Sequence, residues 1–205
     1  MYQYHTNGDH FMRSDIKKYA AAGIVCELLY FASVTLFLVT QLDFALTLWE
    51  LMTVVGAVTM LIVMIAIGEA NEIRPVYRRF LTISLSGTTI LTSVAHFTSI
   101  GVVRPLAAQG EAIPEYFRIG TFPSLEMTVD YTAWGFFMGF AFVSLFFGIK
   151  NRILKIMSLL CGVLCFVGFI GSFFFDYLWY IAIMGYGFGF LIMCIYLCVG
   201  KRQNC

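Results

Sequence analysis

Five ionisable side chains occur within or directly beside long apolar stretches of this sequence, where a charged group is costly to bury. They are Glu27, Glu50, His96, Glu126 and Asp130. An ionised group at the centre of a bilayer costs about 2.5 to 3.5 kcal/mol on insertion scales, so each needs a partner, a bound proton or contact with water. Each is therefore a candidate for a binding or proton-carrying site.

His96 and Asp130 form the first candidate pair. Histidine is the side chain that changes charge near neutral pH, and a carboxyl group is its natural partner. One loop joins the stretches that contain them, so we expect the two side chains to meet near one membrane surface. Glu50 is expected at the same surface and can join the pair, although Glu50 and Glu126 also fit a simple interfacial position.

Glu27 is the deepest of the acids in its stretch, and we expect it to form an inner polar site. The alternative is a neutral acid that hydrogen-bonds to a hydroxyl group such as that of Tyr30. The sequence leaves both interpretations open.

Hydroxyl side chains gather on the same side of the helix as His96. At about 100° per residue, the ones within about 80° of the His96 direction are Thr82, Ser86, Thr89, Thr92, Ser93 and Ser99. This stripe rises about 26 Å, nearly the depth of the hydrocarbon. We expect it to face a solvated path, whereas the alternative is that the hydroxyls bond to their own helix or hold neighbouring helices together.

Four cysteines form two pairs with the same four-residue spacing at the predicted inner ends of two consecutive stretches. They are Cys161, Cys165, Cys194 and Cys198. Four thiols at one depth are a weak candidate for a soft-metal site, because free cysteine usually serves as a small apolar side chain. We expect no metal and no other cofactor.

Gly135 and Gly139 have the GxxxG spacing that lets two membrane helices approach closely. They lie on the side of their helix opposite Asp130. A helix with small residues on one side and an acid on the other is expected to be buried on both, so we place this span near the centre of the bundle.

The composition defines the elements that must position these groups. Of the 205 residues, 60% are hydrophobic and 12% are charged, against about 25% charged in a soluble domain. A net charge of +1 also does not fit a nucleic-acid-binding protein. About 20 apolar residues span a bilayer as a helix, and six such stretches are predicted: Tyr19–Thr40, Thr47–Gly68, Phe80–Val103, Met127–Ile149, Ile156–Phe175 and Trp179–Val199. The prediction is one all-α domain over residues 1–205, a polytopic bundle of six transmembrane helices.

The distribution of lysine and arginine predicts the orientation, because positively charged loops stay in the cytoplasm. Eleven of the 13 fall on one predicted side, which leaves Arg104 and Arg118 on the other. Both termini are then cytoplasmic, with residues 1–18 as a tail and residues 104–126 as an extracytoplasmic loop. Trp49 and Trp179 fall at the outer ends of their spans, which is typical of an interfacial aromatic belt.

The leading functional hypothesis is a small transporter, or a solute-binding membrane subunit, in the cell membrane. In size and number of spans the chain is similar to the six-helix solute-binding subunits of some bacterial transporters, a likeness of architecture without a motif. The predicted outer side favours a cation or a neutral solute, because it has two arginines and seven acids: Asp43, Glu50, Glu111, Glu115, Glu126, Asp130 and Asp176.

Two other classes stay open. The first is a non-transporting membrane partner, such as an assembly, accessory or immunity protein, in which the polar residues only pack helices and a protein partner or a second copy completes the structure. The second is an intramembrane enzyme that modifies lipids with His96 and a carboxyl group as base and acid. The Walker A, HExxH and GxSxG motifs are absent from the sequence, which narrows the range of enzymes.

Overall fold

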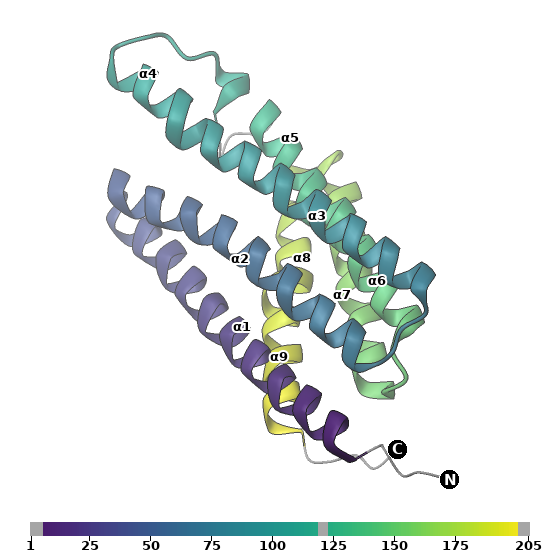
Figure 1. Ribbon diagram of the computed structural model, residues 1–205. Helices are drawn as coiled ribbons and strands as arrows, with labels where there is room; N and C mark the ends of the chain where they lie inside the picture. Colours follow the sequence, from purple (N-terminus) through teal and green to yellow (C-terminus); the bar gives the residue numbers. More distant parts are fainter. Residues whose placement is uncertain (1–5, 119–122, 201–205) are drawn as a thin grey trace.

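The computed structural model describes residues 6–118 and 123–200, and all regular secondary structure in them is helical (Figure 1). Six helices are long and apolar enough to cross a membrane, which confirms the predicted number of spans. The spans are Ile16–Thr40, Asp43–Ala70, Pro75–Ala108, Leu125–Gly148, Arg152–Ser172 and Tyr177–Val199. The chain is thus a multi-pass, all-α membrane protein.

The first two spans form a long antiparallel hairpin of α1 (Thr6–Thr40) and α2 (Asp43–Ala70). Gln41 in the tight connection has a φ of 55°, in the left-handed region. Helix α1 begins well before the predicted span, so most of the predicted tail is helical. Residues 1–5 of that tail lie outside the described part.

The third span is a continuous helical segment of α3 (Pro75–Thr98), a π-helical turn η1 (Ser99–Val103) and α4 (Arg104–Ala108). The predicted loop boundary at Arg104 is therefore wrong, because the helix continues through Arg104. Proline usually ends a helix because it lacks an N–H and its ring crowds the preceding turn. Here Pro105 is the second residue after the π-helical turn, where the regular hydrogen-bond ladder is already interrupted.

The fourth span follows a connection that contains the short 3₁₀ turn η2 (Glu115–Phe117), with residues 119–122 outside the description. It consists of α5 (Leu125–Tyr131), the π-helical turn η3 (Thr132–Phe137) and α6 (Met138–Gly148). The Ser124 hydroxyl caps its start by accepting a hydrogen bond of 3.1 Å from the Met127 N–H.

The last two spans form a second hairpin. Helix α7 (Arg152–Ser172) starts where the Asn151 side chain accepts bonds from two backbone N–H groups. The sixth span is assembled from the 3₁₀ turn η4 (Asp176–Trp179), α8 (Tyr180–Ile183), the π-helical turn η5 (Met184–Gly189) and α9 (Phe190–Val199).

The alternating helices give the bundle two ends. The terminal end is where α1 starts and α9 stops, and the loop end is where α4 stops and α5 starts (Figure 1). Helix α1 packs against α2 and α9, α3 packs against α2 and α6, and α7 packs against α6 and the α8–η5 segment. The predicted cationic side corresponds to the terminal end, apart from Lys201 and Arg202, which lie outside the described part. Its assignment to the cytoplasm stays a prediction.

A core of large apolar side chains fills the bundle towards the terminal end. Met64, Ile67, Leu81, Leu85, Phe142 and Leu145 are each no more than 1% exposed. Large apolar side chains are also exposed along every span, for example Val94 of α3 and Ile170 of α7. Such a surface suits contact with lipid.

Candidate functional site

A cavity of about 430 Å³ lies at the loop end of the bundle, between the α1–α2 hairpin and the η4–α8–η5 segment, with α3 and the fourth span completing its wall. In Figure 1 the α1–α2 hairpin and the α8–α9 segment diverge towards the loop end. The lining side chains are eight aromatic ones (Tyr30, Phe37, Trp49, Tyr131, Trp134, Trp179, Tyr180 and Tyr186), four polar ones (Glu50, Thr53, His96 and Asp130) and three aliphatic ones (Leu46, Met127 and Ile183).

Helical periodicity explains why these side chains converge. Leu46, Trp49, Glu50 and Thr53 on α2 are spaced i, i+3, i+4, i+7, which places them on one helix face. Met127, Asp130, Tyr131 and Trp134 repeat the same spacing on the fourth span. Each face thus combines one carboxyl group with aromatic rings, and the fold brings the two faces to one cavity.

The structure brings His96 and Asp130 together as the sequence led us to expect. The His96 Nε2 atom lies 3.6 Å from the Asp130 Oδ1 atom, and the side chains are 5% and 14% exposed. This separation is longer than a hydrogen bond. Both groups therefore keep hydrogen-bonding capacity for a third partner in the cavity.

Glu50 also lines the cavity, but it forms an ion pair with Arg104, which is not a lining residue. The Arg104 guanidinium donates to Glu50 Oε2 at 2.5 Å through Nη2 and to Thr47 Oγ1 at 2.9 Å through Nη1. Glu50 is 1% exposed, so its carboxyl group lies inside the protein, while its depth in the membrane stays a prediction. The ion pair was missed because Arg104 was assigned to a loop, whereas the continuing helix carries it over α2.

Glu126 is also buried, at 3% exposed, and it does not line the cavity. Its carboxyl oxygens are among nine buried side-chain atoms that have no hydrogen-bond partner among the described residues. These atoms belong to seven residues: Glu50, Thr92, His96, Arg104, Glu126, Asp130 and Trp134. Buried polar groups in folded proteins are normally paired, and here the exceptions are concentrated at the cavity wall and just behind it.

Stacked aromatic rings build a continuous part of the wall. The Tyr131 and Trp179 ring centroids are 3.9 Å apart and those of Trp134 and Tyr186 are 4.6 Å apart. Trp179 links the two pairs, because its centroid lies 6.1 Å from that of Tyr186. Trp179 is only 6% exposed. Its ring therefore faces the protein interior, while its predicted position at the outer membrane interface stays a prediction.

Among the described residues there are three π-helical turns, and two of them carry wall residues. Trp134 belongs to η3 and Tyr186 to η5, while the third turn, η1, begins three residues after His96. A π-helical turn inserts an extra residue and changes which side chains face inward, and such turns are frequent at functional sites. The cavity wall thus coincides with two interruptions of regular α-helix.

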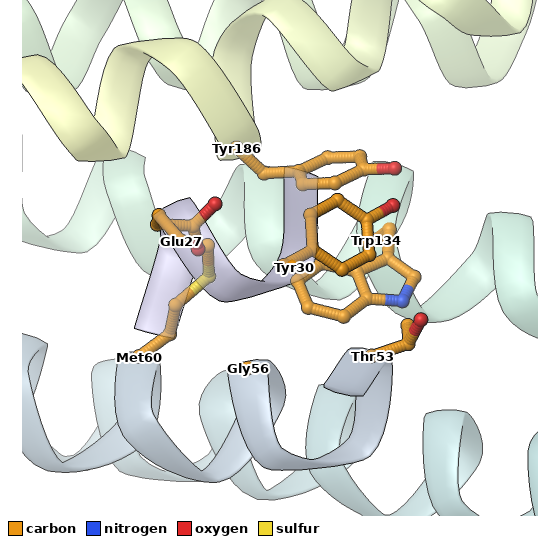
Figure 2. Close-up of a pocket in the computed structure, with 7 residues that line it drawn as sticks. All are labelled: Glu27, Tyr30, Thr53, Gly56, Met60, Trp134 and Tyr186. Atoms are coloured by element: carbon orange, nitrogen blue, oxygen red, sulfur yellow. The ribbon is translucent and has the colours of Figure 1, made fainter. Parts of the chain in front are cut away.

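A second, small cavity lies deeper in the bundle beside Glu27 (Figure 2). Its volume of about 10 Å³ is close to the space that one water molecule occupies. It shares Tyr30, Thr53, Trp134 and Tyr186 with the larger cavity. In Figure 2 the hydroxyl groups of Tyr30 and Tyr186 point away from Glu27, and Met60 extends towards it. Glu27 is 3% exposed and lines the small cavity but not the larger one, which adjoins it at the shared residues.

The hydroxyl stripe of α3 does not form the expected continuous path. Of its members only His96 lines the larger cavity, while Thr82 is exposed and Ser86 is half-buried. Thr89 donates to the Leu85 carbonyl at 2.9 Å and Ser93 to the Thr89 carbonyl at 2.7 Å. These hydroxyls are satisfied by their own helix, which is the usual behaviour of serine and threonine in helices. Thr92 and Ser99 are fully buried.

The predicted glycine contacts are present. A Cβ atom at Gly135 would overlap Phe169 Cβ, and one at Gly139 would lie 3.0 Å from the Phe166 ring, so both glycines pack against α7.

The cysteines do not form one cluster: a Cβ at Gly189 of η5 would meet Cys161, and one at Gly23 of α1 would meet Cys194. Within the described residues, no group of three or more His, Cys, Asp or Glu side chains is placed to hold a metal ion.

The fold and the cavity together define the class of this protein, a six-span membrane protein with an acidic, aromatic cavity near one end. Comparisons with protein families, with curated proteins and with solved structures find no match for the chain.

Proposed function

We propose that this protein binds a small solute in the larger cavity and moves it through the membrane, as a transporter or as the solute-binding subunit of one. The observation that supports this proposal is the set of unpaired buried polar atoms around the cavity. His96, Asp130 and Trp134 are buried or nearly so, line the cavity and have polar atoms with no partner among the described residues. A bound solute is one way to satisfy such atoms.

The adjacent small cavity suggests the direction of the path. From the loop end, a solute or proton would pass His96 and Asp130, then the layer of Tyr30, Trp134 and Tyr186, and would reach Glu27. Beyond Glu27 the bundle is closed by tight packing such as that of Cys194 against Gly23. This path replaces the one along α3, and a movement of the aromatic layer is needed to open it.

The main alternative is a non-transporting partner protein whose polar residues only pack helices. The main-chain hydrogen bonds of Thr89 and Ser93 favour that interpretation for α3. It does not account for the unpaired atoms at the cavity wall. The two hypotheses therefore differ in what they expect when cavity residues are changed.

A binding measurement separates the two. All three tryptophans in the chain line the cavity, so intrinsic fluorescence reports on its contents. Purified protein in a maltoside detergent is titrated with choline, mannitol and succinate as cationic, neutral and anionic probes. We expect saturable quenching by at least one probe, and its loss in His96→Ala. Thr82→Val is the matched control, because Thr82 belongs to the same helix face but is exposed.

A flux measurement then tests transport. Proteoliposomes loaded with the same probes are expected to exchange the bound one faster than protein-free liposomes, and His96→Ala is expected to abolish the difference. Binding without flux would favour a solute-binding subunit. Absence of both binding and flux for all three charge classes would contradict the proposed function.

A further inference from the structure

We propose that the solute is an organic cation, an alkylated ammonium compound with an apolar body, whose charged group sits between Asp130 and the aromatic wall. This inference rests on the proposed function, because it names the ligand class of the same cavity. It is carried by the charges that line the cavity, by the buried rings and by the cavity size.

The charge balance of the lining favours a cation. Glu50 and Asp130 are its two carboxyl groups, and none of the described residues that line it is a lysine or an arginine. Arg104 reaches in from outside the lining and neutralises Glu50. The Asp130 Oδ1 atom lies 3.6 Å from His96 Nε2 and has no hydrogen-bond partner among the described residues. A cationic group can therefore approach Asp130 and find an acceptor that the protein itself leaves free.

The rings decide which kind of cation fits. Ring faces attract cations through the aromatic quadrupole, and cages of Trp and Tyr recognise alkylated ammonium groups. Trp134, Trp179 and Tyr186 form such a surface within the same cavity as Asp130. A small inorganic cation would instead need several oxygen ligands to replace its hydration shell. No group of acidic, His and Cys side chains among the described residues offers such a set.

The alternative explanation for these rings is an aromatic belt at the membrane surface. Belt residues present their rings to the lipid headgroups, whereas Trp134 is 3% and Trp179 is 6% exposed. Both are turned into the protein. The belt therefore does not account for the wall.

The cavity is larger than an ammonium group needs. About 430 Å³ is typical of sites for drug-sized ligands, and Leu46, Met127 and Ile183 supply apolar surface beside the charged region. The ligand therefore has an apolar part next to its cationic group. Two sources have this chemistry, a free organic amine and the choline headgroup of a phospholipid.

A pair of isosteric probes tests the charge directly. Choline and 3,3-dimethyl-1-butanol have nearly the same shape, but the second has a neutral carbon in place of the ammonium nitrogen. With tryptophan quenching in a maltoside detergent, we expect choline to bind at least about tenfold more tightly than the alcohol. Benzyltrimethylammonium is expected to bind more tightly than choline, because its phenyl group fills more of the apolar region.

Two substitutions test the named groups. Asp130→Asn keeps the size of the side chain and removes its charge, and we expect it to remove most of the preference for choline over the alcohol. Tyr186→Leu removes a ring and is expected to weaken choline binding several-fold, whereas Tyr186→Phe keeps the ring and should retain it. Tyr77→Leu is the control outside the cavity, because Tyr77 stacks on Phe147, 5.8 Å between centroids, elsewhere in the bundle.

The outcomes separate this inference from the proposed function. Equal binding of choline and the neutral alcohol, or binding of mannitol or succinate alone, overturns the cation assignment and leaves the solute-binding cavity intact. An unchanged choline preference in Asp130→Asn also overturns it. Failure of every probe to bind overturns both. Preferential binding of short-chain phosphatidylcholine over choline and benzyltrimethylammonium supports the ammonium chemistry with a lipid as its source.

Discussion

The two faces of the fourth span differ in side-chain size and in what they pack against. Towards α7, the span presents Gly135 and Gly139, and the side chains of Phe169 and Phe166 fill the space that the missing Cβ atoms leave. Towards the cavity, the same span presents Asp130 together with the aromatic side chains of Tyr131 and Trp134. Small residues thus allow close helix packing on one face, whereas large amphipathic residues line the cavity on the other.

Helix α7 and the cavity wall also differ in how their polar groups are satisfied. On α7, the hydroxyls of Ser158 and Ser172 donate to carbonyls of their own helix at 2.8 and 2.7 Å. Around the cavity, polar atoms of His96, Asp130 and Trp134 have no such partner among the described residues. The two α7 hydroxyls are satisfied by their own helix. Under the proposed function, a bound solute would supply the partners that the cavity atoms lack.

The largest expected effect comes from breaking the ion pair behind the cavity. Arg104→Met leaves Glu50 buried with no cationic partner, and we expect a loss of about 3 kcal/mol in the free energy of unfolding. The measurement is a dodecyl sulfate titration followed by circular dichroism. Adding Glu50→Gln to this variant should recover most of the loss, since no charge is then left buried. Arg78→Met, at an exposed position, is the control, and an equal loss there would contradict the argument.

The next effect tests the α7 face. Gly135→Ala forces a methyl group against Phe169 Cβ, which is fixed to the α7 backbone and cannot swing away. We expect a loss of about 2 kcal/mol in the same titration. Gly101→Ala is the matched control, because a Cβ there would meet nothing within 4 Å. A Gly135→Ala protein as stable as the wild type would show that this interface is looser than the glycine contacts indicate.

The spans were predictable from sequence because the hydrocarbon imposes both a length and a composition. The meeting of His96 and Asp130 was also within reach, since one loop joins their helices. The ends of the helices were harder to predict from the sequence. Pro105 indicates the end of a helix, yet the segment continues to Ala108 because a π-helical turn precedes the proline.

The aromatic wall was missed although the sequence contains its signal. Trp49, Glu50 and Thr53 on α2 are spaced i, i+1, i+4. Asp130, Tyr131 and Trp134 on the fourth span have the same spacing. Both patterns place an acid and at least one aromatic ring on one helix face. A polar path was instead predicted from the hydroxyl stripe of α3. The π-helical turns have no recognised sequence signature, so the inward turn of Tyr186 could not be foreseen.

A smaller effect compares two hydroxyls one turn apart on α3. Thr88 donates to the Ala133 carbonyl of the fourth span at 3.0 Å, whereas Thr92 is fully buried with no partner among the described residues. We expect Thr88→Val to lower the free energy of unfolding by about 0.6 kcal/mol. Thr92→Val is expected to leave it unchanged or raise it, because an unpaired hydroxyl is removed. Equal losses in the two variants would mean that Thr92 is paired in the membrane.

The smallest expected effect concerns the cavity beside Glu27. A Cβ at Gly56 would meet nothing within 4 Å, so Gly56→Ala places a methyl group in the water-sized space without displacing a neighbour. We expect a gain of about 0.5 kcal/mol in stability, since alanine loses less backbone entropy than glycine in a helix. Choline binding in the larger cavity should be unchanged, because Gly56 does not line it. Choline exchange in proteoliposomes should be slower if the path passes Glu27. An unchanged exchange rate in a stabilised variant would mean that the small cavity is a packing defect and that the path leaves the large cavity elsewhere.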